Sequence, residues 1–398
     1  MPCCGGASSF GPRPSGPQLI EPAQLFARCI LKAERRYDEL VKHDIVVIGA
    51  SAGGVDALSR VVSSLPRDLQ ASVLVVLHVS RGKSLLPEIL SRAGRMRASH
   101  PEDGTALQYS HVYVAPPDHH LIVDNGLARI VHTASENGVR PAVDPLFRSA
   151  ARSYGGRVIA VLLTGALDDG TAGIVAVKAA GGVTIVQDPE EAFSPGMPRS
   201  AIASGSVDHV LPIRDIPVLV AALVHEQAAP DLAPPDHPHL RRMEPDLGRM
   251  PLALRGADSP GKPSVFTCPE CHGTLWEADE AGLLRFRCRV GHIYSPETMI
   301  SAQTDEVDRA LWTALRTLEE RAALAHRLAE RARERQHPLV DRAFTSRAIE
   351  TEVEADRIRQ LLYERAGTSH AIPDDAAGLS GPGAPAAAGP APAPSVRD

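Results

Sequence analysis

A serine between small residues is the first feature of this 398-residue sequence that could do chemistry. Ser51 is the centre of the run 49–53, which fits G-x-S-x-G and stands where a strand-like segment meets a helix-like one. A hydroxyl on such a turn lies beside the free N–H groups of a helix start, where an oxyanion would be stabilised. The motif alone leaves three interpretations open: a catalytic serine, a phosphate cradle or a tight structural turn. Its glycine spacing departs from G-x-G-x-x-G, which makes dinucleotide binding a poorer fit.

Two other strand-like runs end in the residue types that a serine nucleophile needs. His78 ends the run SVLVVLH, and Asp168 and Asp169 follow RVIAVLL in the loop TGALDDG. The carboxyl ends of parallel strands meet at one edge of a sheet, so we expect these side chains to approach Ser51. A serine requires a general base and an orienting carboxylate, which histidine and aspartate supply. The α/β-hydrolase order of serine, acid and histidine would instead require His209 as the base.

Four residues near the C-terminal side have the spacing of a metal site. Cys268 and Cys271 form a C-x-x-C pair, and Cys288 and His292 follow after sixteen intervening residues. Three thiolates and one imidazole fit a tetrahedral structural Zn²⁺. A segment this small has too little apolar core to fold alone, so a metal is physically motivated. Free thiols and a redox C-x-x-C pair are the alternatives, and His272 is a poorer fourth ligand because it directly follows Cys271.

Short apolar runs alternate with helix-like segments and must position the serine, histidine and aspartate. The strand-like runs are 44–50, 72–78, 111–115, 120–123, 128–131, 157–163 and 181–188, and the helix-like runs are 51–65, 144–154 and 173–181. This alternation predicts an α/β fold with a doubly wound, mostly parallel sheet and helices on both faces. Asp144 is the expected N-cap of its helix.

The chain outside this sheet changes in composition several times. We expect a partly disordered leader at 1–43, the sheet domain at 44–227, a Pro-rich linker at 228–262, a zinc-ribbon-like module at 263–300, an α-helical hairpin at 301–367 and a disordered Pro/Ala-rich tail at 368–398. Pro338 is the expected break between the two helices. In the leader, Cys3 and Cys4 could be reactive or palmitoylated, or could be incidental thiols of an unstructured end.

Composition excludes several classes of protein. Net charge is −6 and aromatic residues are 4% of the chain, so the sequence favours neither nucleic-acid binding nor attraction to anionic lipid. No apolar run approaches the roughly 18 residues that cross a bilayer, and the start lacks the pattern of a signal peptide. We therefore expect a cytoplasmic protein without membrane insertion, in which clustered cysteines bind metal rather than form disulfides.

Several motifs between Asp44 and about Leu223 occur in a distinctive order. They are IGASAGGVDAL, VVLHVS, EDGTAL, HVYVAPPDHHL, NGVRPAVDPLFRSAA, LLTGALDDGTAGI, AGGVTIVQD and GMPRSAIASGSVDHVLP. In this order they resemble the CheB-type protein-glutamate methylesterases of bacterial chemotaxis. The resemblance implies a catalytic triad of Ser51, His78 and Asp169. It makes His209 structural and Asp168 a neighbouring loop residue.

The resemblance also implies an activity and its partners. It implies hydrolysis of glutamate 5-O-methyl esters on cytoplasmic helices of chemoreceptors, with glutamine deamidation as a further activity and no catalytic cofactor. Methylated chemoreceptor-like proteins would be partners, with other chemosensory proteins or a second copy bound through the C-terminal helices. Backbone amides near Ala52 and Ala166 would hold the oxyanion. A nucleotide-binding module and a non-catalytic signalling scaffold are the alternatives.

The sequence departs from the family pattern at a few positions. Ala166 and Leu167 stand where the family usually has Met and Gly, and Ala52 stands where many members have Thr. We expect these changes to affect substrate fit more than the triad. The family often has a phosphorylatable receiver domain before the esterase, whereas residues 1–43 show no receiver-like pattern, so we expect regulation by other means.

Overall fold

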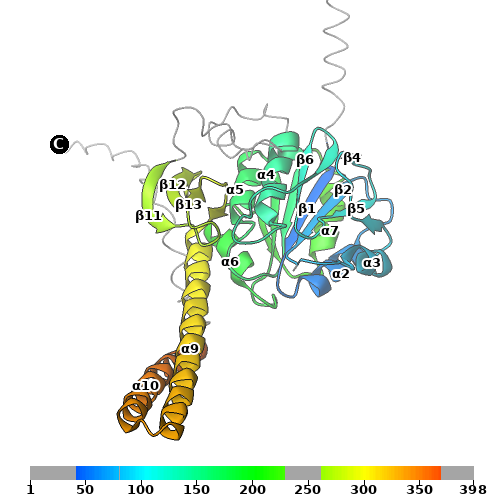
Figure 1. Cartoon of the computed structure of the whole chain (residues 1–398). Coiled ribbons are helices and arrows are strands. Elements are labelled where there is room, and N and C mark those ends of the chain that lie inside the picture. The colour runs from blue at the N-terminus through cyan, green and yellow to red at the C-terminus, as the bar shows by residue number, and fades with distance from the viewer. Residues whose placement is uncertain (1–41, 80, 229–260, 369–398) are drawn as a thin grey trace, which may run out of the picture. The chain divides into compact units, whose positions relative to one another are not determined.

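The computed structural model describes residues 42–79, 81–228 and 261–368. Its largest element is a seven-stranded parallel sheet in the order β10-β9-β8-β1-β2-β5-β3 (Figure 1). The strands are β1 (Ile45–Ala50), β2 (Ser72–Leu77), β3 (Arg97–Ser99), β5 (His111–Val114), β8 (Val158–Leu162), β9 (Val183–Gln187) and β10 (His209–Leu211). Runs of Val and Ile form strands buried on both faces, which a parallel sheet requires. The predicted doubly wound α/β fold is confirmed.

Helices cover both faces of this sheet. One face carries α2 (Gly54–Ser64), α3 (Leu86–Ala93) and α7 (Ile216–Leu223), and the other carries α4 (Val143–Tyr154), α5 (Thr171–Ala179) and α6 (Gly196–Ala203). Successive residues of β1 alternate between the two layers: Val46 and Ile48 pack in one, Ile45 and Val47 in the other. The carboxyl ends of β1, β2 and β8 therefore lie between two rigid apolar layers.

Two predicted strand runs form a sheet of their own. β6 (His120–Asp124) and β7 (Leu127–Val131) pair antiparallel, and β4 (Thr105–Ala106) adds to β7. The two-residue turn Asn125-Gly126 has positive φ at both positions, which is the geometry of a tight hairpin and imposes antiparallel pairing.

The expected N-cap role of Asp144 is wrong. Helix α4 begins at Val143, and its N-cap is Ala142. The Asp144 carboxylate is fully buried and accepts a hydrogen bond from Gly173 N at 2.7 Å. Its side chain therefore serves tertiary contacts rather than its own helix end.

A third sheet, also antiparallel, begins at Lys262. Its strands are β11 (Lys262–Thr267), β12 (Thr274–Glu280), β13 (Leu283–Cys288) and β14 (Ile293–Tyr294). We call residues 261–295 the C-terminal module.

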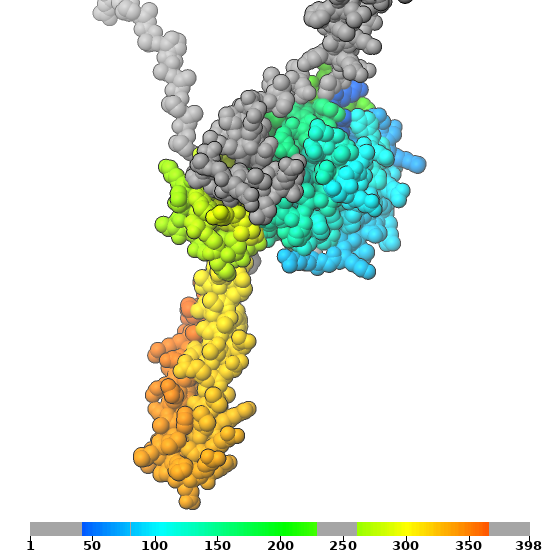
Figure 2. All heavy atoms as spheres, turned by 45° about the horizontal axis from the view of Figure 1, so that its top comes forward, coloured from blue at the N-terminus to red at the C-terminus, as the bar shows by residue number. Residues whose placement is uncertain are grey.

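Two long helices complete the described chain, α9 (Pro296–Glu334) and α10 (Pro338–Thr368). Helix α9 begins earlier than expected because Ser295 and Thr298 form a capping box. The two helices pack through Leu315, Ala355 and Leu362. Figure 2 shows the helices in contact along most of their length. The predicted hairpin with its break at Pro338 is confirmed. None of the helices in the described ranges is long and apolar enough to span a membrane. Several predictions fall on residues outside the described ranges. They concern Cys3 and Cys4, most of the predicted linker and nearly all of the predicted tail.

Candidate active site and candidate metal centre

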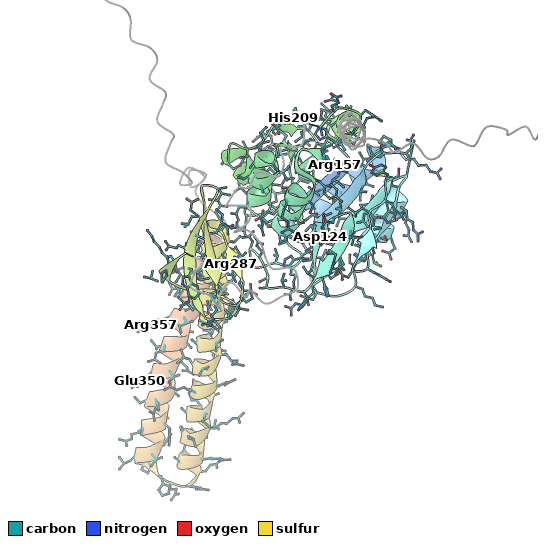
Figure 3. All side chains as sticks on the ribbon, turned by 90° about the horizontal axis from the view of Figure 1, so that it is seen from above. Asp124, Arg157, His209, Arg287, Glu350 and Arg357 are labelled. Atoms are coloured by element: carbon teal, nitrogen blue, oxygen red, sulfur yellow. The ribbon has the colours of Figure 1, made fainter. Side chains whose placement is uncertain are left out.

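Ser51, His78 and Asp169 meet at the carboxyl edge of the parallel sheet. They follow β1, β2 and β8, which are adjacent strands. His78 Nδ1 lies 3.0 Å from Ser51 Oγ, and His78 Nε2 lies 2.7 Å from Asp169 Oδ2. With the ring proton on Nε2 donated to Asp169, the Nδ1 lone pair accepts the serine hydroxyl. The alternative base His209 (Figure 3) lies on the edge strand β10. Strand β9 separates β10 from β8.

The turn that carries Ser51 is held by backbone hydrogen bonds. Ser51 N donates to Thr164 O at 2.9 Å, and Gly54 N donates to Ser51 O at 2.8 Å. Gly53 precedes α2 with φ of 75°, and a Cβ there would lie 2.6 Å from Phe193 Cβ. Only glycine fits both the left-handed backbone and the close approach. The turn therefore fixes the serine at the start of α2.

Asp169 is buried and accepts several hydrogen bonds besides that of His78. Asn137 Nδ2 donates at 2.9 Å, and the amides of Val143 and Asp144 donate at 2.6 and 3.3 Å. These amides belong to the first turn of α4, whose positive dipole end favours an anion. Burial raises the pKa of Asp169, but hydrogen bonding and charge at His78, with the Val143 amide, hold this pKa down at about 2. The carboxylate is therefore ionised across the physiological range.

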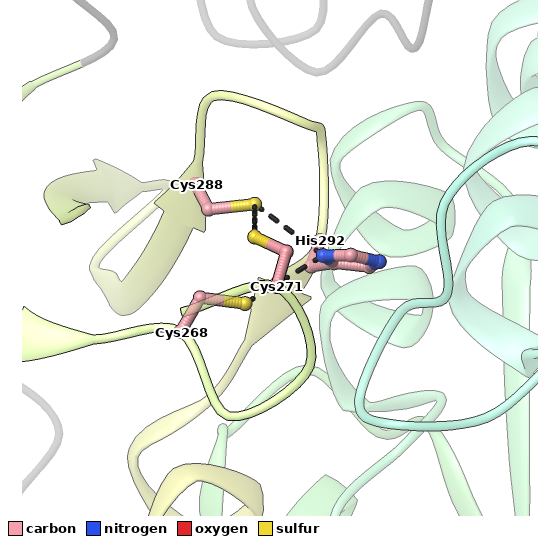
Figure 4. A group of neighbouring side chains, drawn as sticks. All are labelled: Cys268, Cys271, Cys288 and His292. Carbon is pink, nitrogen blue, oxygen red and sulfur yellow. Dashed lines mark hydrogen bonds between the residues drawn. The ribbon is translucent and has the colours of Figure 1, made fainter. Parts of the chain in front are cut away.

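The four predicted metal ligands also converge. The donor atoms of Cys268, Cys271, Cys288 and His292 all lie within 4.8 Å of one another (Figure 4). The sulfurs of Cys271 and Cys288 are 3.6 Å apart, and His292 Nδ1 lies 3.6 and 3.4 Å from the sulfurs of Cys268 and Cys288. A tetrahedral Zn²⁺ with Zn–S bonds of about 2.3 Å has sulfur–sulfur edges near 3.8 Å, so this donor set fits zinc. His272 instead is largely exposed and lies 3.9 Å from Glu306.

Comparison with known proteins places the sheet in a family. The sequence model of the CheB methylesterase family matches residues 46–220. A Leptospira interrogans putative protein-glutamate methylesterase/protein-glutamine glutaminase is 34% identical over 185 residues, covering 46% of this chain and 96% of that protein. This chain belongs to the CheB methylesterase family.

Other CheB relatives are similar over different shares of their length. The protein-glutamate methylesterase/protein-glutamine glutaminase 2 of Anaeromyxobacter dehalogenans is 41% identical over 44% of this chain, which spans only 51% of that relative. The Pyrococcus horikoshii protein is 34% identical over 55% of this chain and 67% of its own length. The solved Thermotoga maritima CheB methylesterase catalytic domain matches with 38% identity and a TM-score of 0.44, over 46% of this chain and all of that one.

The positions where this CheB chain departs from the family pattern lie on the loop after β8 and beside Ser51. Leu167, which replaces the usual Gly, has φ of 60°, a conformation that glycine adopts without strain. Ala52 and Ala166 are exposed, and none of the described residues accepts a hydrogen bond from their amides. Both N–H groups are therefore available to a substrate oxygen.

Sequence reasoning missed a group of buried polar residues behind Asp169. They are Glu136, Asn137, Arg148, Arg285 and Ser295, joined by Asp144 and Asp168. Burial raises the pKa of Asp168 to about 7, against the opposing effects of Arg285 and the Ser295 hydroxyl. Burial and the Asp169 charge raise the pKa of Asp144 to about 6. The motif NGVRPAVDPLF contains part of this group, but its partners lie about 150 residues further along, where no local pattern marks them.

Proposed function

We propose that this chain is a serine esterase that hydrolyses glutamate 5-O-methyl esters on chemoreceptor cytoplasmic helices, releasing methanol in chemotaxis-type adaptation. The observation that carries the proposal is the continuous hydrogen-bonded series Ser51–His78–Asp169 in a member of the CheB methylesterase family. The printed names of the relatives, protein-glutamate methylesterase, support the same substrate class.

The proposed reaction follows from the geometry. Ser51 Oγ attacks the ester carbonyl as its proton passes to His78 Nδ1, and Asp169 stabilises the imidazolium through Nε2–H. The amides of Ala52 and Ala166 hold the oxyanion, a contribution of about 3 kcal/mol per donor in other hydrolases. His78 then returns the proton to the leaving methoxide, and methanol departs. Water, deprotonated by His78, then attacks the acyl carbonyl, and the proton passes from His78 to Ser51 Oγ as glutamate is released.

Glutamine side chains would form the same acyl-enzyme. The leaving group would then be ammonia, and the second step would be identical. Relatives whose names include protein-glutamine glutaminase support this further activity. Neither reaction requires a cofactor.

Methanol release from methylated receptor membranes tests the esterase proposal. Replacing Ser51→Ala removes the nucleophile and should lower the rate about a thousandfold or more. Ser63→Ala, which changes an exposed serine of α2, is the matched control and should leave the rate unchanged. Equal rates for wild type and Ser51→Ala would contradict the proposal.

We also propose that Cys268, Cys271, Cys288 and His292 bind a structural Zn²⁺. All four tetrahedral positions would be filled by protein, which leaves no open position for catalysis. Glu270 Oε2 lies 3.3 Å from His292 Nε2, an arrangement that orients metal-bound imidazoles.

Metal analysis of the full chain in reducing buffer tests the zinc proposal. We expect about one zinc per chain, and less than about half of that would contradict the proposal. His292→Ala should lower the content, whereas His272→Ala, which changes an exposed histidine nearby, should not.

We further propose the division into a catalytic domain at 44–227, a zinc-ribbon-like module at 263–300 and a helical extension at 301–367.

Methylated chemoreceptors in the cytoplasm would be the substrates. Other chemosensory proteins or a second copy would bind through α9 and α10, where Trp312 and Tyr363 are exposed. Light scattering of the full chain checks self-association, since a monomeric mass would contradict the second copy.

A further inference from the structure

The C-terminal module reaches the residues behind the catalytic aspartate through buried polar contacts. Arg285 on β13 is 2% exposed, and its Nη2 donates to Glu136 Oε1 at 2.7 Å and Asp144 Oδ2 at 3.2 Å. Ser295, equally buried, donates its hydroxyl to Asp168 Oδ1 at 2.8 Å. A single module therefore contacts the acidic neighbours of Asp169 from two elements.

Asn137 connects these contacts to Asp169 itself. Its Oδ1 accepts from Ser295 N at 3.3 Å and Thr298 Oγ1 at 3.4 Å. Its Nδ2 donates to Asp169 Oδ1 at 2.9 Å and to Asp144 Oδ2 at 3.2 Å. Donors at the start of α9 on one side and the two carboxylates on the other therefore orient the amide, with its N–H toward the catalytic carboxylate.

The backbone around Asn137 is paired with the module as well. Asn137 N donates to Ile293 O at 2.7 Å, and Glu136 forms a parallel bridge with Ile293. Ser135 donates its hydroxyl to the Glu270 carboxylate, which also accepts from Tyr294 Oη at 2.8 Å. Because Glu270 also contacts His292, the proposed zinc ligands and the catalytic aspartate share one chain of contacts.

The buried charges show why contact with the C-terminal module affects the position of the catalytic residues and not only the docking of the module. Two buried carboxylates, Glu136 and Asp144, pair with two buried guanidinium groups, Arg148 and Arg285. The buried carboxyl groups of Asp168 and Asp169 lie beside them and have other partners, the Ser295 hydroxyl and His78. Removing one partner of a buried pair leaves a charge without compensation, and the remaining groups must move or neutralise. Loss of Arg285 would affect Asp144, whose amide donates to Asp169.

We propose that the C-terminal module completes the catalytic centre: Arg285 and Ser295 are positioning residues that hold Asp169 through Asn137, Asp144 and Asp168. A metal held by Cys268, Cys271, Cys288 and His292 would then stabilise the position of Asp169. This inference rests on the proposed function only in taking Ser51 as the nucleophile.

A fluorophosphonate probe tests the proposal without the receptor substrate. Ser51 Oγ bonds to phosphorus, fluoride leaves, and His78 takes the hydroxyl proton. In the full chain, Arg285→Met should lower the maximal labelling rate about 10- to 100-fold with probe affinity unchanged, as expected for a misplaced catalytic group. Arg287→Met is the matched control two positions along β13, because none of the described residues pairs with that guanidinium, and it should label as wild type.

Ser295 separates positioning from helix capping. Aspartate caps helices as well as serine does. At pH 8, where Asp168 is ionised, a carboxylate at this position cannot donate to Asp168 and adds a like charge. Ser295→Asp should therefore label about tenfold or more slowly, whereas Ser295→Thr, which keeps cap and donor, should stay near wild type. Wild-type labelling by folded Ser295→Asp and Arg285→Met, or equal loss in Ser295→Asp and Ser295→Thr, would overturn the proposal.

Hydrogen exchange supplies a readout independent of activity. Adding a zinc chelator to the full chain should speed amide exchange in residues 135–139 and 165–170, and unchanged exchange there would overturn the link to the metal ligands. A wild-type chain that labels but releases no methanol would contradict only the proposed substrate, and the variants would still decide this inference. A wild-type chain that labels no faster than Ser51→Ala would overturn both.

Discussion

The parallel sheet and the C-terminal module bury very different material. Apolar side chains fill both faces of the sheet, in two layers that include Leu58 and Phe147. The module has only a small cluster of buried residues, and two of its members are the thiols Cys268 and Cys288. Hydrophobic burial can stabilise the sheet by itself, whereas the module requires ligand bonds to a metal. The two regions should therefore respond to different perturbations. The polar contacts of Arg285 and Ser295 should be where a change in the module affects the catalytic residues.

Asp169→Asn should produce the largest effect on the rate, and it should leave metal binding unchanged. An amide cannot keep the His78 ring proton on Nε2 or stabilise the charged imidazolium as the carboxylate does. We therefore expect kcat to fall about 10⁴-fold, the loss typical of triads. Zinc content should stay at the wild-type value. Asp68→Asn, which changes an exposed aspartate, provides the control for both measurements.

Phe147→Ala should come next, and it should affect the sheet alone. The ring is fully buried against Gly173, where a Cβ would lie 2.5 Å from Phe147 Cβ. Truncation should lower the free energy of unfolding of the sheet by about 3–5 kcal/mol in urea denaturation. Loss of zinc from the folded variant would break the distinction between the two regions.

Asp168→Asn should produce the smallest effect, a change in how the free energy of unfolding depends on pH. It tests a residue at the contact between the two regions. Burial raises the pKa of Asp168 to about 7, so between pH 4 and 7 the folded chain holds a proton that the unfolded chain releases. This group therefore lowers stability as pH rises through that range, by at most about 1.4 kcal/mol per pH unit. Denaturation at pH 5, 6 and 7 should show a shallower decline for Asp168→Asn, and an equal slope would count against a protonated Asp168.

The sequence allowed the sheet and its catalytic edge to be predicted because their signals are local. Ser51 and His78 directly follow strand runs, and Asp168 and Asp169 lie in the loop after a third, so parallel strands bring them to one edge. The choice of His78 over His209 and of Asp169 over Asp168 came from the family resemblance. The antiparallel pairing of β6 with β7 is also marked locally, by the turn Asn125-Gly126. The contacts of Arg285 could not be predicted, because a buried ion pair between distant segments depends on how they dock rather than on spacing.

The ion pairs of Arg285 have a consequence for the history of the chain. Once a buried carboxylate on one segment relies on Arg285 of another, deleting the later segment leaves Glu136 and Asp144 sharing Arg148 alone. A gene shortened after residue 227 would encode a sheet whose acidic group lacks the Arg285 guanidinium. Loss of the C-terminal module would therefore have to be preceded by replacement of Glu136 and Asp144 with uncharged residues.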